Sequence, residues 1–208
     1  VDAANTLFDN LLTEPYAAFD FVGKNTDNGY SVWASNVIYN ETMKKYVMYF
    51  CTTSSYVKST LCFATADNIE GPYTYVDTIL YSGYGKSNIS ETNLYDVLGK
   101  NADISRYLEY GGYNNKEWPN CIDPAIFTDA DGRMWMNYGS WSGGIFLLEI
   151  DPTTGYPIYP VDDKDADPYY GYRLIGGGHH SAEGPYIQYD AENGYYYLFV
   201  SYGDLQSD

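Results

Sequence analysis

The sequence predicts an all-β protein built from repeated antiparallel units, which is the arrangement of a β-propeller. Short aromatic and apolar segments recur along the chain, and hairpin signals such as Asp131-Gly132 and Asn193-Gly194 stand between them. Tyr, a residue that favours strands, accounts for 26 of the 208 residues. Patterns typical of helices are weak throughout. Repeated units of three to four strands, each presenting the start of its inner strand to a common point, are typical of propeller blades.

The first unit begins with a strand over residues 33–39, followed by a turn over 40–45. A longer aromatic strand over 46–50 and a further strand over 59–65 complete it. Residues 81–118 then form an insertion rich in Gly, Asn, Ser and Tyr, with a short helix over 94–98. Such an excursion is more often a functional or rim loop than a linker.

The second and third units repeat the pattern. Strands are expected over residues 122–127, 134–138 and 144–150 in the second unit, and over 186–189 and 195–200 in the third. A propeller ring needs four to eight blades. We therefore expect residues 1–208 to form one partial propeller domain of about three blades, interrupted by the insertion at about 81–118.

The composition of the chain limits the classes of molecule that it is expected to bind. The formal net charge is −17, from 28 Asp and Glu against 11 Lys and Arg, which disfavours nucleic acid because phosphate backbones would be repelled. No apolar run is long enough to predict a membrane span. Three cysteines, Cys51, Cys62 and Cys121, fit no metal-binding spacing and are expected to be buried thiols, with a Cys51–Cys62 disulfide as the alternative.

Two carboxyl groups occupy the same place in successive units. Glu183 precedes a strand that we expect to be buried, and Asp123 stands before Pro124 at the start of another. A rigidly held, partly desolvated carboxyl has a raised pKa and suits a general acid. Taken singly, each residue is also compatible with an ordinary turn. A ring would aim both at its axis, and two carboxyls in an aromatic pocket suffice to split a glycosidic bond.

The chain resembles the catalytic domain of glycoside hydrolase family 43, especially its arabinanase-like members. The matching stretches are residues 33–39, 69–73, 120–124, 138–145 and 182–187. The resemblance implies a five-bladed propeller with three inward carboxylates. It makes Glu183 the general acid and Asp123 the residue that raises the pKa of that acid. The general base would lie outside this chain, with Asp9 and Asp20 as the nearest and poor substitutes.

Further substrate-binding residues are expected around these carboxyls. Trp33 begins an inner strand and either lines the pocket or packs in the core, and Asn120 offers a donor and an acceptor to sugar hydroxyls. By resemblance, residues 140–142 form a loop that borders the cleft. The expected set is completed by the members of that loop and by one histidine near the acid: Ser140, Trp141, Ser142 and His180.

The resemblance implies a secreted or periplasmic bacterial enzyme that cleaves α-L-arabinofuranosidic bonds in arabinan with inversion of configuration. The stretch 139–145 favours arabinan over the alternative, a β-xylosidase or arabinofuranosidase acting on xylan or arabinoxylan. An alternative of another class is a non-catalytic propeller that binds glycans. No metal site is expected among these residues. Calcium, which relatives often hold through the last blade, is left open, as is a second chain or fragment that supplies the missing blades.

Overall fold

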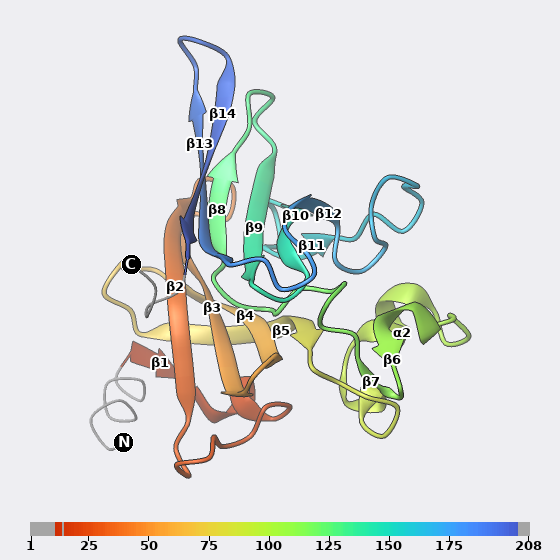
Figure 1. The fold of residues 1–208 in the computed structure, drawn as a ribbon. Coiled ribbons are helices and arrows are strands. Elements are labelled where there is room, and N and C mark those ends of the chain that lie inside the picture. Colours follow the sequence, from red (N-terminus) through yellow and green to blue (C-terminus); the bar gives the residue numbers. More distant parts are fainter. Residues whose placement is uncertain (1–10, 14, 204–208) are drawn as a thin grey trace.

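The computed structural model describes residues 11–13 and 15–203, and its β-sheets are arranged as successive blades (Figure 1). The first blade is a five-stranded sheet in the order β1-β5-β4-β3-β2. Strands β2 to β5 form an antiparallel meander, and β1 pairs with β5 in parallel. The bounds are Leu12–Thr13 for β1, Ser31–Asn40 for β2, Lys45–Ser55 for β3, Lys58–Ala66 for β4 and Tyr73–Ser82 for β5. The three strands predicted for this unit are confirmed.

The second blade contains β8 (Ala125–Thr128), β9 (Met134–Ser140) and β10 (Gly144–Ile150), and β10 also pairs with β11 (Pro157–Ile158) and β12 (Tyr172–Ile175). The strand expected over 122–127 begins only at Ala125. Asp123 has a φ of 54°, which is incompatible with an extended strand, and Pro124 has no N–H to donate. The two residues therefore form an irregular entry to β8.

The third blade is represented by the hairpin of β13 (Ala182–Asp190) and β14 (Tyr195–Tyr202). The expectation that this strand pair is buried is wrong for much of its surface. Tyr195, Phe199 and Tyr202 are 63%, 58% and 81% exposed. The reason is that β13 packs on β8 and β9, whereas β14 contacts mainly β13 within the described part of the chain.

The insertion carries the predicted helix, α2 (Leu94–Leu98), as well as the small hairpin of β6 (Leu108–Glu109) and β7 (Gly112–Tyr113). Three short 3-10 helices, one before β2 and two in the insertion, are η1 (Pro15–Phe19), η2 (Ile89–Glu91) and η3 (Ser105–Tyr107). The insertion lies to one side of the blades (Figure 1).

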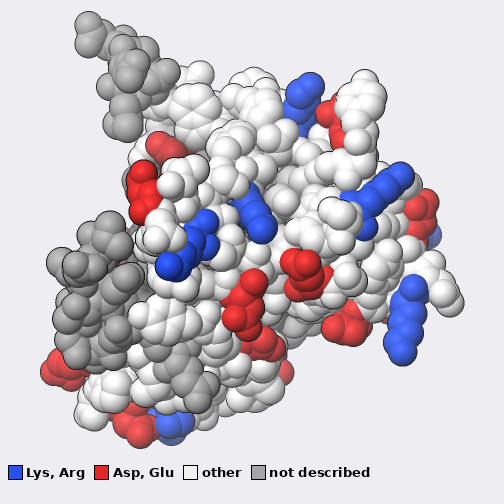
Figure 2. Space-filling model, turned by 90° about the horizontal axis from the view of Figure 1, so that it is seen from below, with Lys and Arg blue, Asp and Glu red and all other residues white. Residues whose placement is uncertain are grey.

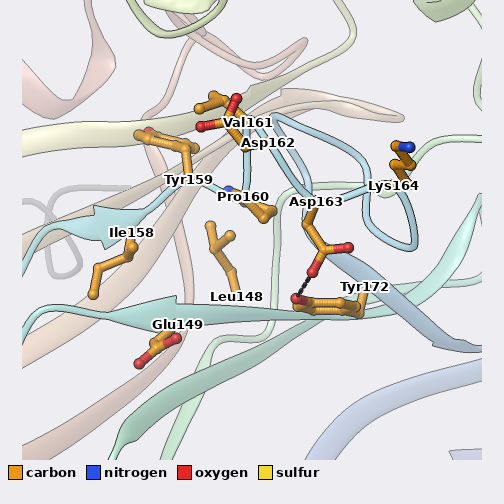
Figure 3. A pocket seen from close by; sticks show the side chains of 10 residues that line it. All are labelled: Leu148, Glu149, Ile158, Tyr159, Pro160, Val161, Asp162, Asp163, Lys164 and Tyr172. Carbon is orange, nitrogen blue, oxygen red and sulfur yellow. Dashed lines mark hydrogen bonds between the residues drawn. The ribbon is translucent and has the colours of Figure 1, made fainter.

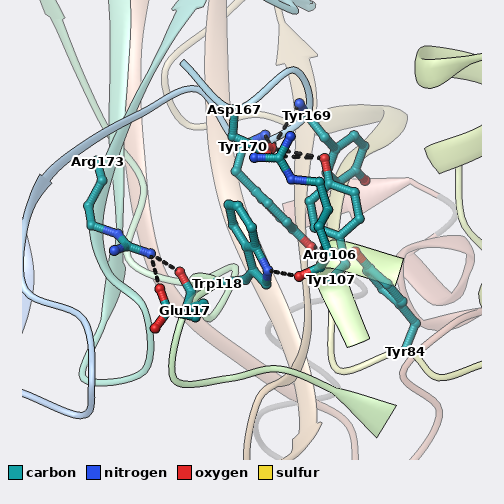
Figure 4. Close-up of polar contacts among 9 residues, drawn as sticks. All are labelled: Tyr84, Arg106, Tyr107, Glu117, Trp118, Asp167, Tyr169, Tyr170 and Arg173. Carbon is teal, nitrogen blue, oxygen red and sulfur yellow. Dashed lines mark hydrogen bonds and ion pairs between the residues drawn. The ribbon is translucent and has the colours of Figure 1, made fainter. Parts of the chain in front are cut away.

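A buried carboxylate fastens this insertion to the second blade (Figure 4). The Tyr107 hydroxyl donates to both oxygens of Asp167 at 3.1 Å, and an Arg106 nitrogen lies 3.2 Å from Oδ2. Trp118 donates from Nε1 to the Arg106 carbonyl at 2.7 Å, and Arg173 donates to the Glu117 carbonyl. Asp167 is thus a structural residue of a tyrosine-rich core, although it ends the acidic stretch 162–167.

The three cysteines are buried free thiols, as expected. Cys51 pairs with Leu61 and Cys62 with Phe50 across β3 and β4. Successive residues of a strand point to opposite faces of the sheet, so Cys51 and Cys62 face apart and the alternative disulfide is wrong.

Charges are mixed on the surface. On the described part of the face in Figure 2, Lys and Arg side chains lie singly among acidic and uncharged ones. None of the helices found in the described residues is long and apolar enough to span a membrane.

Candidate functional site

The inner strands of the three blades are β2, β8 and β13, and their first parts converge on one open cavity of about 390 Å³. The first blade contributes Ala34, Ser35 and Asn36. The second and third blades contribute residues 123–125 and 183–185, and Ser201 of β14 completes the lining. Asp123 and Glu183 therefore meet in one place, as their equivalent positions in the repeat predicted.

Local backbone irregularities bring these segments to the cavity. The pairing of β2 shifts between Trp33 and Asn36, and that of β13 shifts between Glu183 and Tyr186. Ala34, Asp123 and Gly184 all have positive φ, at 29°, 54° and 59°. Bulges of this kind bend a strand and redirect its side chains, and they are common beside active sites. Two inner strands, β2 and β13, thus depart from regular pairing where they line the cavity, and β8 is entered there through the left-handed Asp123.

Asp123 links the second blade to the third. Its Oδ2 accepts a hydrogen bond from the Gly184 N–H at 3.1 Å. Burial raises the pKa of Asp123 above its ordinary value, the Gly184 N–H lowers it, and the nearby carboxylate of Glu183 raises it again. Asp123 and Glu183 are both half-buried. The two carboxyls are close enough to influence each other, which is the arrangement that an acid and its modulator need.

Two asparagines that sequence reasoning missed hold the strand starts in register. The Asn36 Oδ1 accepts from the Ile126 N–H at 3.1 Å, and the Asn137 Nδ2 donates to the Pro185 carbonyl at 2.7 Å. Each bond joins neighbouring blades directly beside a cavity residue. Asn36 lies in the same motif as Trp33, so its position was a usable signal; Asn137 lies inside an apolar strand and offered none.

Trp33 and Asn120 line a second cavity, of about 210 Å³, on the first blade. Trp33 is 54% exposed, so it is a surface residue of this cavity and not a core residue. Asn120 is buried, and its Oδ1 accepts from the Ser82 hydroxyl at 3.4 Å. The structure therefore brings these two predicted residues together. They lie beside the cavity that holds Asp123 and Glu183, which we call the axial cavity.

Residues 140–142 form the end of β9 and the turn that follows it, and most of this segment is buried; its place at the border of the cleft stays a prediction. Ser140 is the last residue of β9 and is buried, and Ser142 is 1% exposed. Trp141 is half-buried. The reason is that this turn packs under neighbouring segments, where Ser142 donates to the Tyr56 hydroxyl at 3.3 Å and its carbonyl accepts from the His179 N–H.

The structure places His179, not His180, against another side chain of this region. The His179 Nδ1 lies 3.2 Å from the Tyr56 hydroxyl. His180 is exposed, and its Nδ1 lies 2.5 Å from the carbonyl of Gly177 in its own loop. It lines neither of the two cavities described above. The role of His180 in binding substrate stays a prediction.

A larger cavity of about 630 Å³ lies at the outer edge of the second blade (Figure 3). It is lined by residues of β10, β11 and the acidic loop, and the Tyr172 hydroxyl donates to Asp163 at 2.5 Å. None of the predicted site residues lines it. We therefore place the candidate site at the cavity where two carboxyls from different blades meet, although the cavity at the outer edge of the second blade is larger.

Comparison with known proteins shows which family the chain resembles. A sequence model of the family described as Glycosyl hydrolases family 43 matches residues 81–208. An extracellular endo-α-(1→5)-L-arabinanase of Thermotoga petrophila is 39% identical over 174 residues, which are 84% of this chain and 32% of that protein. Extracellular endo-α-(1→5)-L-arabinanase 2 of Bacillus subtilis is 36% identical over 203 residues, 98% of this chain and 37% of that protein. The chain thus spans about a third of the length of these relatives.

Solved structures confirm the fold. A crystal structure of the endo-1,5-α-L-arabinanase from Thermotoga petrophila matches with a TM-score of 0.64 and 40% identity, over 84% of this chain and 34% of that one. A family 43 glycoside hydrolase from Bacillus licheniformis matches with a TM-score of 0.71 and 34% identity, over 94% and 38%. The all-β fold with a partial propeller, predicted from the repeated units, is confirmed.

Proposed function

The chain belongs to glycosyl hydrolases family 43, and on this basis we propose that it is part of the catalytic domain of an arabinan-degrading hydrolase. The proposed reaction is cleavage of α-L-arabinofuranosidic bonds with inversion of configuration. The observation that carries the proposal is the meeting of Asp123 and Glu183 in one axial cavity, joined through the Gly184 N–H. The names of the two relatives above, both arabinanases, support arabinan as the substrate.

Glu183 is proposed as the general acid. Its proton passes to the glycosidic oxygen as the bond from that oxygen to the anomeric carbon breaks, and the leaving sugar departs as an alcohol. Asp123 acts on Glu183 through its charge and fixes the loop of Glu183 through the Gly184 N–H. Its role as modulator of the acid stays a prediction.

The general base is proposed to lie outside this chain. An inverting enzyme needs a carboxylate on the far face of the sugar to activate water. Asp20 is exposed next to η1 and lines neither described cavity, and Asp9 lies outside the described residues. Another segment of the protein, or a second chain, would supply this group together with the remaining blades.

The cellular location of the protein and its metal content are also proposed. Both relatives are named extracellular, which supports a secreted protein; the periplasmic alternative stays a prediction. Among residues 11–13 and 15–203, no group of three or more His, Cys, Asp or Glu side chains is placed to hold an ion. The calcium that the resemblance left open stays a prediction, and the proposed reaction uses none of the described residues as a calcium ligand.

The test is Glu183→Gln in the whole protein that carries this chain. Release of arabinose oligomers from debranched arabinan should fall by about 10²–10⁴-fold, the usual contribution of a general acid. The rate of hydrolysis of an aryl arabinofuranoside with a good leaving group should fall much less, because that leaving group needs no proton. The matched control is Glu192→Gln, an exposed carboxyl in the turn of the same hairpin, and it should leave both rates unchanged.

Three results would contradict the proposal. Full activity of Glu183→Gln on arabinan would exclude it as the acid. Hydrolysis of arabinoxylan but not of arabinan by the unmodified protein would favour the alternative substrate. Binding of arabinan without hydrolysis by the unmodified protein would favour a glycan-binding propeller.

A further inference from the structure

The loop of residues 176–181, which we call the acid loop, leads directly into the strand that carries Glu183. Its first four residues are three glycines followed by His179, and all four have positive φ, at 86°, 99°, 62° and 63°. Glycine adopts this region of backbone conformation freely, whereas a histidine in it is uncommon. Successive glycines also give a loop much conformational freedom. The observed conformation of the acid loop therefore depends on contacts with other segments.

The position of the Glu183 carboxyl depends on the backbone that carries it. Within residues 11–13 and 15–203, no hydrogen bond or ion pair holds this carboxyl. On its C-terminal side the backbone is fixed, because the Gly184 N–H donates to Asp123 at 3.1 Å. On its N-terminal side, three residues separate Glu183 from His179. A shift of His179 would therefore be passed on to Glu183.

Backbone hydrogen bonds hold the acid loop from one direction. The Gly178 N–H donates to the Lys116 carbonyl at 2.8 Å, and the His179 N–H donates to the Ser142 carbonyl at 3.2 Å. Lys116 belongs to the insertion and Ser142 to the turn between β9 and β10 of the second blade. These two bonds thus connect the acid loop with the insertion and the second blade.

The side chain of His179 adds a contact with the first blade. Its Nδ1 lies 3.2 Å from the hydroxyl of Tyr56, in the turn between β3 and β4. The Ser142 hydroxyl donates to the same Tyr56 oxygen at 3.3 Å, so the phenolic proton is available to Nδ1. The turn is itself fixed, because the Ser82 hydroxyl donates to the Val57 carbonyl at 2.7 Å. The bond between Tyr56 and His179 therefore joins a glycine-rich loop to a firmly held turn.

We propose that His179 and Tyr56 are positioning residues for the general acid. Their hydrogen bond fastens the acid loop to the first blade and keeps Glu183 within reach of the glycosidic oxygen. Proton transfer needs the two oxygens within about 2.6–3.2 Å of each other, and a small misplacement of a reacting group has a large effect on rate. The inference rests on the proposed function and extends it, because it gives the first blade a part in placing the acid.

The experiment compares Tyr56→Phe, His179→Ala and His179→Asn in the whole protein that carries this chain. Tyr56→Phe removes only the hydroxyl. Asparagine keeps an acceptor near the place of Nδ1 and tolerates positive φ, whereas alanine does neither. The control is Tyr156→Phe, which removes another hydroxyl that joins the first two blades, through its 3.1 Å bond to Asp77. Tyr156 lines neither the axial cavity nor the cavity that contains Trp33.

Tyr56→Phe and His179→Ala should each lower kcat on debranched arabinan by about three- to tenfold, the usual contribution of one hydrogen bond, with KM unchanged. The kcat on an aryl arabinofuranoside with a good leaving group should stay unchanged, because that reaction does not need the acid. His179→Asn should recover most of the activity on arabinan, and Tyr156→Phe should match the unmodified protein. The double variant should lose no more than either single variant, since both changes remove the same bond.

Hydrogen exchange of residues 176–184 provides a readout that needs no activity. Circular dichroism and thermal unfolding first establish that each variant is folded. Exchange in this segment should then be about three- to tenfold faster in Tyr56→Phe than in the unmodified protein, because the loop opens more often without the bond. Tyr156→Phe should leave the exchange of this segment unchanged. Equal exchange in Tyr56→Phe and the unmodified protein would overturn the fastening of the loop.

The kinetic results separate this inference from the proposed function. An unchanged kcat of Tyr56→Phe on arabinan, beside an impaired Glu183→Gln, would overturn this inference and leave the proposed function in place. A raised KM with unchanged kcat would also overturn it, because Tyr56 would then act on substrate binding. So would an equal loss of kcat on arabinan and on the aryl substrate, which a merely structural role would produce. Full activity of Glu183→Gln would overturn the proposed function, and the positioning of an acid would fall with it.

Discussion

Asp167 is expected to be a main source of stability where the insertion meets the second blade. Its two oxygens have different tasks. Oδ1 accepts from the backbone N–H groups of Tyr169 and Tyr170 at 3.0 and 2.7 Å, whereas Oδ2 faces Arg106. The Tyr107 hydroxyl donates to both. Asp167 is 6% exposed, so water cannot readily replace it.

Asp167→Ala would leave two backbone donors and the Tyr107 hydroxyl without an acceptor in the interior. Each such group costs about 1–3 kcal/mol, and breaking a buried charged pair typically costs about 3–5 kcal/mol, which we take as the total. Asp167→Asn keeps an oxygen for the two N–H groups and loses the contact with Arg106. That arginine is about half exposed, so the cost should be about 1–2 kcal/mol.

The assay is thermal unfolding of both variants beside Asp162→Asn, which alters an exposed carboxyl of the same loop. For a domain of this size 1 kcal/mol corresponds to about 2–4 °C in Tm. Asp167→Ala should therefore lower Tm by roughly 6–20 °C, Asp167→Asn by a few degrees, and Asp162→Asn hardly at all. Equal losses in the alanine and asparagine variants would refute the division of tasks between the two oxygens.

Three further outcomes are expected. Gly184→Ala should cost about 1–2 kcal/mol and lower kcat, because a φ of 59° is unfavourable for alanine although its Cβ would meet only the Ser201 Oγ, at an ordinary contact distance of 3.8 Å; unchanged Tm and kcat would contradict this. The three cysteines should resist a thiol reagent in the folded protein and react fully in denaturant, because burial raises the pKa of Cys51 to about 12 and that of Cys62 to about 11; fast labelling of the folded protein would speak against it. Because the pKa of Asp123 is raised above 3.8, mainly by burial, its stabilising contribution should be present below that value and be lost as pH rises through the folded-state pKa. Urea unfolding across this window should show that loss in the unmodified protein and not in Asp123→Asn, and identical profiles would rule it out.

The positions of the strands could be predicted from the sequence because they follow from the local pattern of residues. Hairpin signals, aromatic segments and the repeat predicted β2, β4, β9, β10 and β14 close to their observed bounds. They also predicted β3 and β13, but β3 ends at Ser55 and β13 begins at Ala182, outside the predicted 46–50 and 186–189. The equivalence of Asp123 and Glu183 also followed from the repeat, since equal positions in successive blades point to one axis. The start of β8 was placed three residues too early because the left-handed backbone of Asp123 carries no sequence signal of its own.

Contacts between distant segments could not be read in this way. Packing of loops and blades decides three such contacts. They are the contact of His179 with Tyr56, the burial of Ser140 and Ser142, and the link from Asn137 to Pro185. The direction of a loop side chain is set by neighbours that are remote in sequence, so residue type and spacing do not specify it.

The sequence by itself determined the repeated strands, the family resemblance and the pair of carboxyls, because these depend on residue type and on period. Only the tertiary structure decided that Asp123 reaches the Gly184 N–H, that Tyr56 stands beside Trp33, and that Asp167 is a buried anchor. These features join residues about 20 to 60 positions apart, and the distance between two such residues is set by the packing of whole blades.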